Sequence, residues 1–213
     1  MTKRQGGAAL PDFWAEASRV LAANDPVMAS MVKRYQGRGL ASRGDPFATL
    51  MRSVVGQQIS VRAADAVWGR LMEALGAPDA EAVLGSDATI LRACGLSYRK
   101  IEYVQDLAGR FADGRIDPTR WRGLADSEII AELTETRGIG AWTVEMLLIF
   151  NLMRPDVWPV DDKGLQKAVA LHYLDGRVPP RKELLAIGER WRPWRSVATW
   201  YLWRSLDPVP VEY

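Results

Sequence analysis

The spacing of apolar residues along the chain is helical almost throughout. Phe47, Leu50 and Val54, for example, recur at intervals of three and four residues and so share one face of a helix. Residues that favour helices dominate such stretches, whereas the strict alternation that marks a strand is rare. Gly and Pro steps separate the stretches and predict helices over residues 10–23, 26–35, 45–56, 59–75, 79–84, 87–93, 98–111, 126–136, 141–153, 161–174, 182–191 and 194–206. The pattern therefore predicts an all-α protein with short links between its helices.

Composition narrows the class of protein. The chain has 213 residues, of which 48% are apolar and 25% charged, so it can bury a core as one domain or as two closely packed lobes. A net charge of +2 permits an anionic partner without requiring one. Cys94 and His172 are the only residues of their types, which excludes an internal disulfide and a Cys-rich or multi-His metal site.

Two further features bear on where the chain works. The longest apolar stretch, at residues 146–150, is far too short to span a membrane, and the first residues lack the apolar region of a signal peptide. A chain without disulfides also fits a reducing compartment. The sequence therefore predicts a cytoplasmic protein with no membrane partner.

The most informative segment runs from Leu133 to Leu147, where an Arg-Gly-Ile-Gly step joins two helices. Gly138 and Gly140 flank the apolar Ile139 and allow a sharp turn that can approach a ligand closely. The first N–H groups of the following helix then suit a phosphate. This pattern predicts a helix–hairpin–helix, which binds the DNA backbone without reading its sequence. A plain helix–helix turn with a glycine cap is the alternative.

Other segments extend the pattern. Taken together they resemble the helix–hairpin–helix DNA glycosylase superfamily, and within it the 3-methyladenine DNA glycosylase II (AlkA-type) branch. The segments that carry the resemblance are VGQQIS at 55–60, GLS at 95–97 with Lys100, GIGAWT at 138–143, DVWPVDD at 156–162 and ERWRPWRS at 189–196. They occur in the family's order and span roughly residues 10–206.

The resemblance implies a two-lobed helical fold with the active site in the cleft between the lobes. One lobe would comprise residues 10–43 and 158–213, and the other residues 44–157 with the hairpin, after a loose tail at residues 1–9. Double-stranded DNA with a damaged base would lie across the cleft. We expect the protein to act as a monomer, on the nucleoid if the source is a bacterium.

Asp162 matches the family's catalytic aspartate. Cleavage of an N-glycosidic bond builds positive charge on the deoxyribose, which a fixed carboxylate stabilises while it orients or deprotonates the attacking water. Alternatively Asp162 only caps the helix that starts at Lys163, and both roles are compatible. For Asp161 we expect a cap or a hydrogen-bonding partner.

Position 142 bears on the reaction type. Relatives that also nick DNA carry a lysine there as an amine nucleophile, whereas this chain has Trp142. The resemblance therefore implies a monofunctional glycosylase without lyase activity. Trp142, Met146 and Trp203 match base-pocket positions, where aromatic faces would hold a flipped cationic purine. Met146 departs from the tyrosine that is common in the family.

The resemblance also implies the DNA contacts. Gln58 matches the wedge that fills the gap left by a flipped base, although an ordinary exposed amide pair is the alternative for Gln57 and Gln58. The expected DNA-binding residues are Gln57, Gln58, Ser60, Lys100, Arg137, Gly138, Ile139, Gly140, Ala141 and Thr143. The backbone carbonyls of Thr134, Thr136 and Ile139 match a structural Na⁺ or K⁺ site, and no cofactor is required.

These inferences predict an enzyme of base excision repair that hydrolyses 3-methyladenine and 7-methylguanine from DNA. Two alternatives stay open at this point. One is a glycosylase for oxidised or mismatched bases, and the other is a non-catalytic helix–hairpin–helix module that binds damage without cleaving it.

Overall fold

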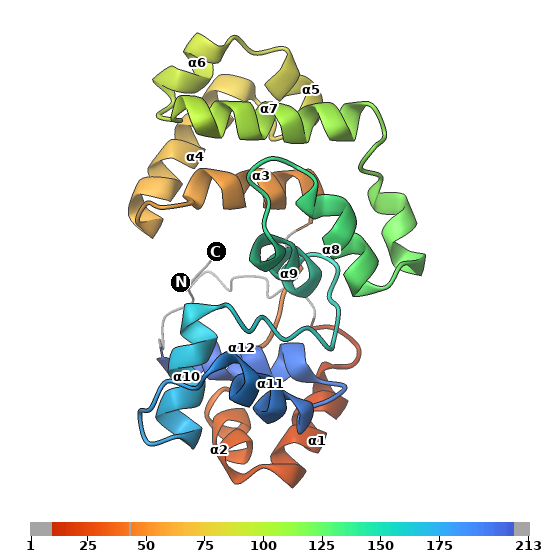
Figure 1. Ribbon diagram of the computed structural model, residues 1–213, viewed down its shortest axis with the longest axis vertical. Helices are drawn as coiled ribbons and strands as arrows, with labels where there is room; N and C mark the ends of the chain where they lie inside the picture. Colours follow the sequence, from red (N-terminus) through yellow and green to blue (C-terminus); the bar gives the residue numbers. More distant parts are fainter. Residues whose placement is uncertain (1–9, 43, 207–213) are drawn as a thin grey trace, which may run out of the picture. The chain divides into compact units, whose positions relative to one another are not determined.

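The computed structural model describes residues 10–42 and 44–206, and within those ranges it contains helices and links but no strand (Figure 1). The all-α prediction is thus confirmed. The chain divides into two compact units, one formed by the described residues up to Ser42 and from Leu148 on, the other by those between 44 and Leu147. The boundary falls inside a helix, whereas the sequence placed it after Val157. The predicted tail at residues 1–9 lies outside the described residues.

Most helices begin where a short polar side chain caps them. Asp25, Asp45, Ser60 and Ser97 each accept a hydrogen bond from a backbone N–H of the first turn that follows. The first unit contains α1 (Trp14–Asn24), α2 (Pro26–Arg34), α10 (Lys163–Tyr173), α11 (Arg181–Glu189) and α12 (Arg195–Leu206). The second contains α3 (Pro46–Gly56), α4 (Val61–Leu75), α5 (Ala80–Leu84), α6 (Ala88–Ala93), α7 (Tyr98–Ala112), the 3₁₀ helix η1 (Pro118–Gly123) and α8 (Asp126–Thr134). Helix α9 (Ala141–Phe150) runs across the boundary.

Helix α9 is shorter than the apolar pattern predicted. It ends at Phe150 rather than Met153, which adopts a left-handed conformation with φ of 53°. The N–H of Arg154 then donates to the carbonyl of Leu148 at 2.9 Å and closes the turn. Pro155 disfavours a helical conformation at Arg154 and so keeps the helix from resuming after this turn.

The core of the second unit forms where α3 packs on α7 (Figure 1). Leu50 and Val54 of α3 and Val104 and Leu107 of α7 are completely buried. Their spacing of three or four residues places each pair on one helix face, which provides the main driving force for packing. This packing also brings the end of α3 beside the start of α7.

In the first unit, Asp25 joins three elements. Its Oδ1 accepts from the N–H groups of Val27 and Met28 and so caps α2, while Oδ2 accepts from Tyr173 Oη at 3.0 Å and Trp191 Nε1 at 3.1 Å. Burial and the neighbouring Asp25 carboxylate raise the pKa of Tyr173 far above its usual value, so its hydroxyl remains a donor. Asp25 is therefore a buried structural carboxylate with its acceptor positions occupied.

Trp158 in the first unit gives a test of core packing. Its Nε1 donates to Leu184 O at 3.0 Å, and a Cβ added at Gly188 would overlap its ring. We expect Gly188→Ala to destabilise the protein by about 1–3 kcal/mol through overpacking. The control is Gly69→Ala in α4, where a Cβ meets no atom within 4 Å and the better helix former should add about 0.5–1 kcal/mol. Urea denaturation midpoints should shift in opposite directions, and shifts of the same sign would contradict this packing.

Candidate functional site

The turn between α8 and α9 has the geometry of a helix–hairpin–helix. Gly138 lies in the left-handed region with φ of 79°, and a Cβ there would overlap the ring of Tyr103. Only glycine therefore fits this position. Ile139 is buried, and its N–H donates to the Thr136 carbonyl at 3.1 Å, which tightens the turn.

The opposite side of the turn faces solvent. Gly140 and Ala141 are exposed, and a Cβ at Gly140 would meet no atom within 4 Å. The first N–H groups of α9 have no acceptor within the helix, so an anion can approach them closely. Thr143, by contrast, is buried.

The Gln57–Gln58 turn links α3 to α4 and contacts the hairpin directly. Gln57 Nε2 donates to the Gly138 carbonyl at 2.8 Å. Gln58 is exposed and has φ of 59°, a conformation that few residues other than glycine adopt. Ser60 accepts a hydrogen bond from Ala63 N at 3.3 Å and so caps α4. The structure thus brings the Gln57–Gln58 turn and the hairpin together.

Two basic residues expected at DNA have partners within the protein. Lys100 Nζ donates to the carbonyls of Val55 and Gln57, both at 2.7 Å, and burial lowers its pKa below the usual value. The guanidinium of Arg137 lies 3.8 Å from a carboxylate oxygen of Glu102, with two thirds of the side chain exposed. A surface pair of this kind is weak, so Arg137 remains able to turn to a phosphate.

Asp162 lies at the start of α10 in the first unit. Its Oδ1 accepts from Leu165 N at 2.6 Å and from Trp203 Nε1 at 2.8 Å, and only 7% of the residue is exposed. The helix-capping geometry predicted for Asp162 is present, and the Trp203 hydrogen bond is an addition to it. Asp161 is exposed and lies 3.4 Å from Arg181, as a hydrogen-bonding partner would.

The chain that leads to Asp162 is held along its length. Ser196 Oγ donates to the Arg154 carbonyl at 2.6 Å and accepts from Val157 N at 2.9 Å. Arg195, whose side chain is largely buried, makes a two-pronged contact with Asp156 at 2.7 and 3.0 Å. The segment 189–196 carried the family resemblance but had no predicted role. Its Arg195 and Ser196 side chains hold the backbone that precedes Asp162.

Trp203 is itself held from two sides. Its ring stacks on Phe150 with centroids 5.7 Å apart and planes 12° from parallel. A Cβ at Gly164 would lie 3.1 Å from Asp162 Oδ1 and 3.2 Å from Trp203 Cδ1, so a larger residue would press on the hydrogen-bonded pair. Sequence reasoning missed Phe150 and Gly164 because neither stands in a chemically reactive pattern.

The remaining base-pocket candidates lie in the other unit. Trp142 is half-buried and Met146 is buried, both on α9 before the boundary at Leu147. Asp162 and Trp203 belong to the first unit. The predicted base pocket therefore draws residues from both units, and it stays a prediction.

The carbonyls expected to hold a monovalent cation are compatible with that role. The Thr136 carbonyl accepts a hydrogen bond from Ile139 N at 3.1 Å, and a carbonyl oxygen has a second lone pair. Neutral oxygens with unused lone pairs are ligands that Na⁺ and K⁺ accept. No cluster of His, Cys, Asp and Glu suited to a metal ion occurs within the described ranges.

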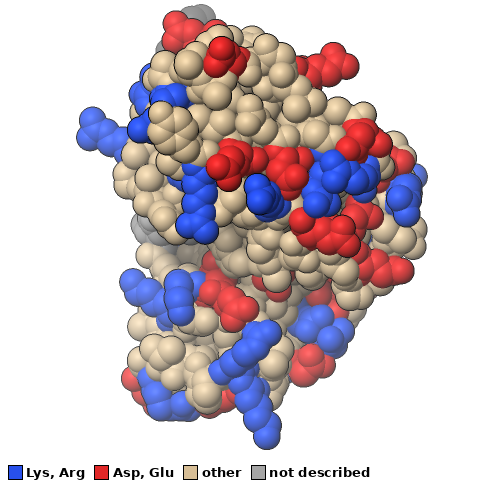
Figure 2. Space-filling model, turned by 45° about the horizontal axis from the view of Figure 1, so that its top comes forward, with Lys and Arg blue, Asp and Glu red and all other residues tan. Residues whose placement is uncertain are grey.

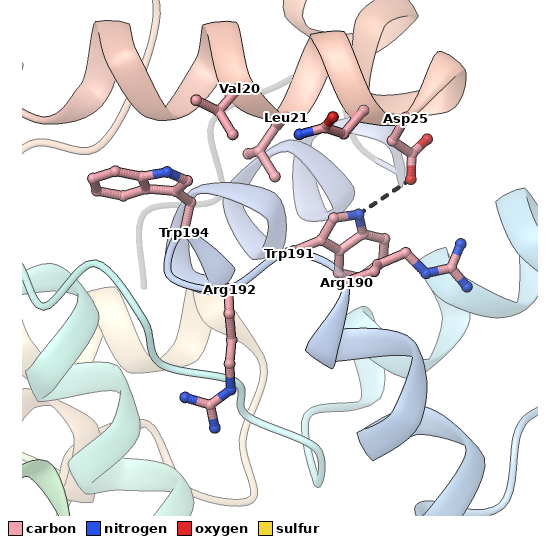
Figure 3. Close-up of a pocket in the computed structure, with 8 residues that line it drawn as sticks. Val20, Leu21, Asp25, Arg190, Trp191, Arg192 and Trp194 are labelled. Carbon is pink, nitrogen blue, oxygen red and sulfur yellow. Dashed lines mark hydrogen bonds between the residues drawn. The ribbon is translucent and has the colours of Figure 1, made fainter.

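Other candidate features have structural explanations. A pocket in the first unit is lined by Asp25, Arg190 and Trp191, but the Asp25 carboxylate is occupied by donors from the protein (Figure 3). His172 Nε2 lies 2.8 Å from Ser205 Oγ, and burial lowers the pKa of the imidazole. Cys94 is buried.

Surface charge does not form one broad field on the face drawn in Figure 2, where Lys and Arg are interspersed with Asp and Glu. With a net charge of only +2, binding to an anionic polymer has to rest on local groups such as the hairpin N–H groups. No helix among the described residues is long and apolar enough to cross a membrane.

This combination of a glycine hairpin, a neighbouring glutamine turn and a helix-capping aspartate defines a class of protein. Residues 51–193 match the HhH-GPD superfamily of base excision DNA repair proteins, and the chain belongs to that superfamily. The resemblance inferred from the sequence motifs is thereby confirmed.

Particular relatives sharpen the comparison. The chain is 34% identical over 183 residues to DNA-3-methyladenine glycosylase 1 of Schizosaccharomyces pombe, covering 84% of this chain and 80% of that protein. The structure of the 3-methyladenine DNA glycosylase of that yeast in complex with abasic DNA has a TM-score of 0.80 at 32% identity, covering 93% and 98% of the two chains. A DNA-3-methyladenine glycosidase structure from Bacillus halodurans also gives 0.80, at 34% identity and with 90% and 89% covered.

The exposed glycine of the hairpin provides a test that leaves the fold intact. We expect Gly140→Asp to weaken binding to damaged and undamaged duplex by the same factor, about tenfold or more, because a carboxylate would face the phosphate backbone. Gly123→Asp adds the same charge at another open glycine and should bind like wild type. Fluorescence anisotropy with labelled duplexes measures both. Equal affinities of Gly140→Asp and wild type would show that the hairpin is not the DNA contact.

Proposed function

We propose that the protein is a monofunctional DNA glycosylase that starts base excision repair by hydrolysing the N-glycosidic bond of alkylated purines, with 3-methyladenine and 7-methylguanine as substrates. The observation that carries the proposal is the buried Asp162 carboxylate, fixed at the N-terminus of α10 by two donors. The relatives named as 3-methyladenine DNA glycosylases support the choice of substrate.

The role proposed for Asp162 follows from the charge that develops on the sugar. The C1′–N bond breaks with its electron pair leaving on the base, and the deoxyribose becomes cationic. A carboxylate held in place stabilises that cation without having to reorganise during the reaction. Water then adds its oxygen to C1′, and its proton passes to the carboxylate or to solvent. The Trp203 N–H and the Leu165 N–H would hold the carboxylate in position during this sequence.

Selectivity for an alkylated base has two sources. A purine methylated at N3 or N7 already carries positive charge, so it leaves as a neutral base without further protonation. The same charge favours the face of an indole, an attraction of about 0.5–2 kcal/mol for each ring. Trp142 is proposed to provide that face to a base flipped out of the duplex. The hydrogen bond to Asp162 gives Trp203 a positioning task in addition to the pocket role that the sequence indicated.

The absence of an amine at position 142 supports hydrolysis rather than lyase chemistry. Lys163 is the amine adjacent to Asp162 in sequence, but its Nζ donates to Gln166 Oε1 at 3.2 Å on the exposed side of α10. A lyase needs an amine that can attack C1′. We therefore propose that water is the nucleophile.

The hairpin and its surroundings would anchor the duplex. Phosphate oxygens would accept from the first N–H groups of α9, and Gln58 would fill the space of the flipped base. A Na⁺ or K⁺ bound to the carbonyls of Thr134, Thr136 and Ile139 would add positive charge beside the phosphate. A monomer in the cytoplasm, bound to the nucleoid if the source is bacterial, is the proposed working form.

The role of Asp162 is tested by a substitution that removes the charge and keeps the cap. In Asp162→Asn, the amide oxygen still accepts from Leu165 N, and Asn caps helices about as well as Asp. We expect base release under single-turnover conditions to fall by about 10²-fold or more. Asp161→Asn, which removes an exposed neighbouring charge, should retain the wild-type rate. An Asp162→Asn protein that folds, binds DNA and releases base at the normal rate would remove the carboxylate from the mechanism.

Reaction type and lesion class are tested with methylated DNA. We expect chromatography to show free 3-methyladenine and 7-methylguanine, and denaturing gels to show strand breaks only after alkali. Breaks without alkali, or a protein–DNA adduct trapped by borohydride, would demonstrate lyase chemistry by an amine such as Lys163. Release of oxidised guanine or mispaired adenine, without alkylated bases, would assign the enzyme to a different lesion class.

A further inference from the structure

One face of α7 connects the two loops that are proposed to contact DNA. Lys100, Tyr103, Asp106 and Arg110 follow one another at steps of three or four residues, so they share this face of the helix. All four are partly buried. None of them takes part in the proposed reaction, so the mechanism does not explain why they lie on one helix face.

The start of this face holds the Gln57–Gln58 turn. Lys100 Nζ donates at 2.7 Å to each of two carbonyls, those of Val55 and Gln57, at the C-terminal end of α3. The last carbonyls of a helix have no partner within it, and a cation is the favourable group to place there. The ammonium therefore fixes the backbone on both sides of Gly56 immediately before Gln58.

The next turns of α7 hold the hairpin. Asp106 Oδ2 accepts from the backbone N–H of Arg137 at 2.9 Å, and Arg110 Nη2 donates to the Glu135 carbonyl at 3.0 Å. The ring of Tyr103 occupies the space beside Gly138. The hairpin is thus held at successive positions by side chains of a single helix.

A direct hydrogen bond completes the connection. Gln57 Nε2 donates to the Gly138 carbonyl at 2.8 Å, so the turn and the hairpin contact each other as well as α7. Gln58 meanwhile has a positive φ, a conformation that persists only where the surroundings determine it. The contacts of Lys100 and Gln57 provide those surroundings.

We propose that this face of α7 is a positioning bridge that fixes the Gln58 side chain relative to the phosphate-binding N–H groups of the hairpin. Binding of the hairpin to the backbone and entry of Gln58 into the duplex would then be one event. Lys100 is a positioning residue in this arrangement and does not contact phosphate. The inference rests on the proposed glycosylase function and adds the device that couples DNA binding to base flipping.

The test separates positioning from phosphate binding by salt dependence. Lys100→Met removes the ammonium, and Arg122→Met removes an exposed positive charge from the same unit as the matched control. Affinity for a duplex with an abasic-site analogue is measured over a range of salt concentrations. A lost phosphate contact would reduce the slope of log affinity against log salt by about 0.9. We expect Lys100→Met to leave that slope unchanged.

The second readout follows Gln58 itself. 2-Aminopurine placed opposite the lesion becomes fluorescent when the pair opens. We expect the fluorescence change and the single-turnover base release to fall about tenfold in Lys100→Met and to stay at wild-type level in Arg122→Met. Gln57→Ala, which removes only the hydrogen bond to Gly138, should give the same loss with the same slope, and it carries the test if Lys100→Met does not fold.

Two results would overturn the bridge. A slope reduced by about 0.9 would make Lys100 a phosphate ligand. Normal fluorescence and base release in both Lys100→Met and Gln57→Ala would show that the contacts have no positioning effect. Failure of the bridge is distinct from failure of the proposed function, because the latter would appear in the wild-type protein as no base release at all.

Discussion

The hydrogen bonds that converge on Asp162 Oδ1 are the constraint on which the proposed mechanism depends. One oxygen accepts from the first turn of α10 and from the indole of Trp203 on α12, so the carboxylate sets the start of one helix and is tied to another. A buried carboxylate is costly unless donors compensate it, and a helix N-terminus adds a favourable dipole. The same contacts that make Asp162 tolerable in the fold also restrict its orientation. One arrangement therefore serves both the stability of the fold and the proposed chemistry.

The groups proposed to bind DNA and the proposed catalytic carboxylate belong to different units. In the second unit, side chains of α7 hold both the hairpin and the Gln57–Gln58 turn. The hairpin N–H groups are proposed to bind phosphate, and Gln58 is proposed to enter the opened base pair. In the first unit, the side chains of Arg195 and Ser196 fix the segment that leads to Asp162. Each unit builds its own part from contacts between its own residues. The backbone N–H groups of the hairpin and a net charge of only +2 favour backbone recognition over broad electrostatic attraction.

Features fixed by local chemistry could be predicted from the sequence. The helices follow from apolar spacing and caps, Gly138 follows from the need for a positive φ, and the cap by Asp162 follows from its place before Lys163. The predicted end of α9 was wrong by a few residues, because apolar spacing does not reveal the left-handed turn at Met153 that follows the helix. These are properties of a few consecutive residues.

Partners that lie far apart in the chain could not be predicted in this way. Trp203 stands 41 residues from Asp162, and Lys100 stands 45 residues from Val55, so only the packing of helices brings their polar atoms together. The family resemblance implied that Lys100 contacts DNA and that Trp203 lines the base pocket. A sequence motif identifies the residue at a position but not the atoms that its side chain contacts. Asp106 carried no signal in the sequence beyond its place on one face of a helix.

The central claim is that Trp203 acts through the Asp162 carboxylate. Single-turnover base release in Trp203→Phe, in Asp162→Asn and in the double variant tests it most directly. Phe keeps an aromatic ring against Phe150 but cannot donate to Asp162, and the double variant separates that loss from the effect of the smaller ring. We expect Trp203→Phe to lose about tenfold or more, as for a hydrogen bond to a charged group, and the double variant to be no slower than Asp162→Asn. Additive losses would contradict this claim, because they would show that the Trp203 N–H does not act through the Asp162 carboxylate.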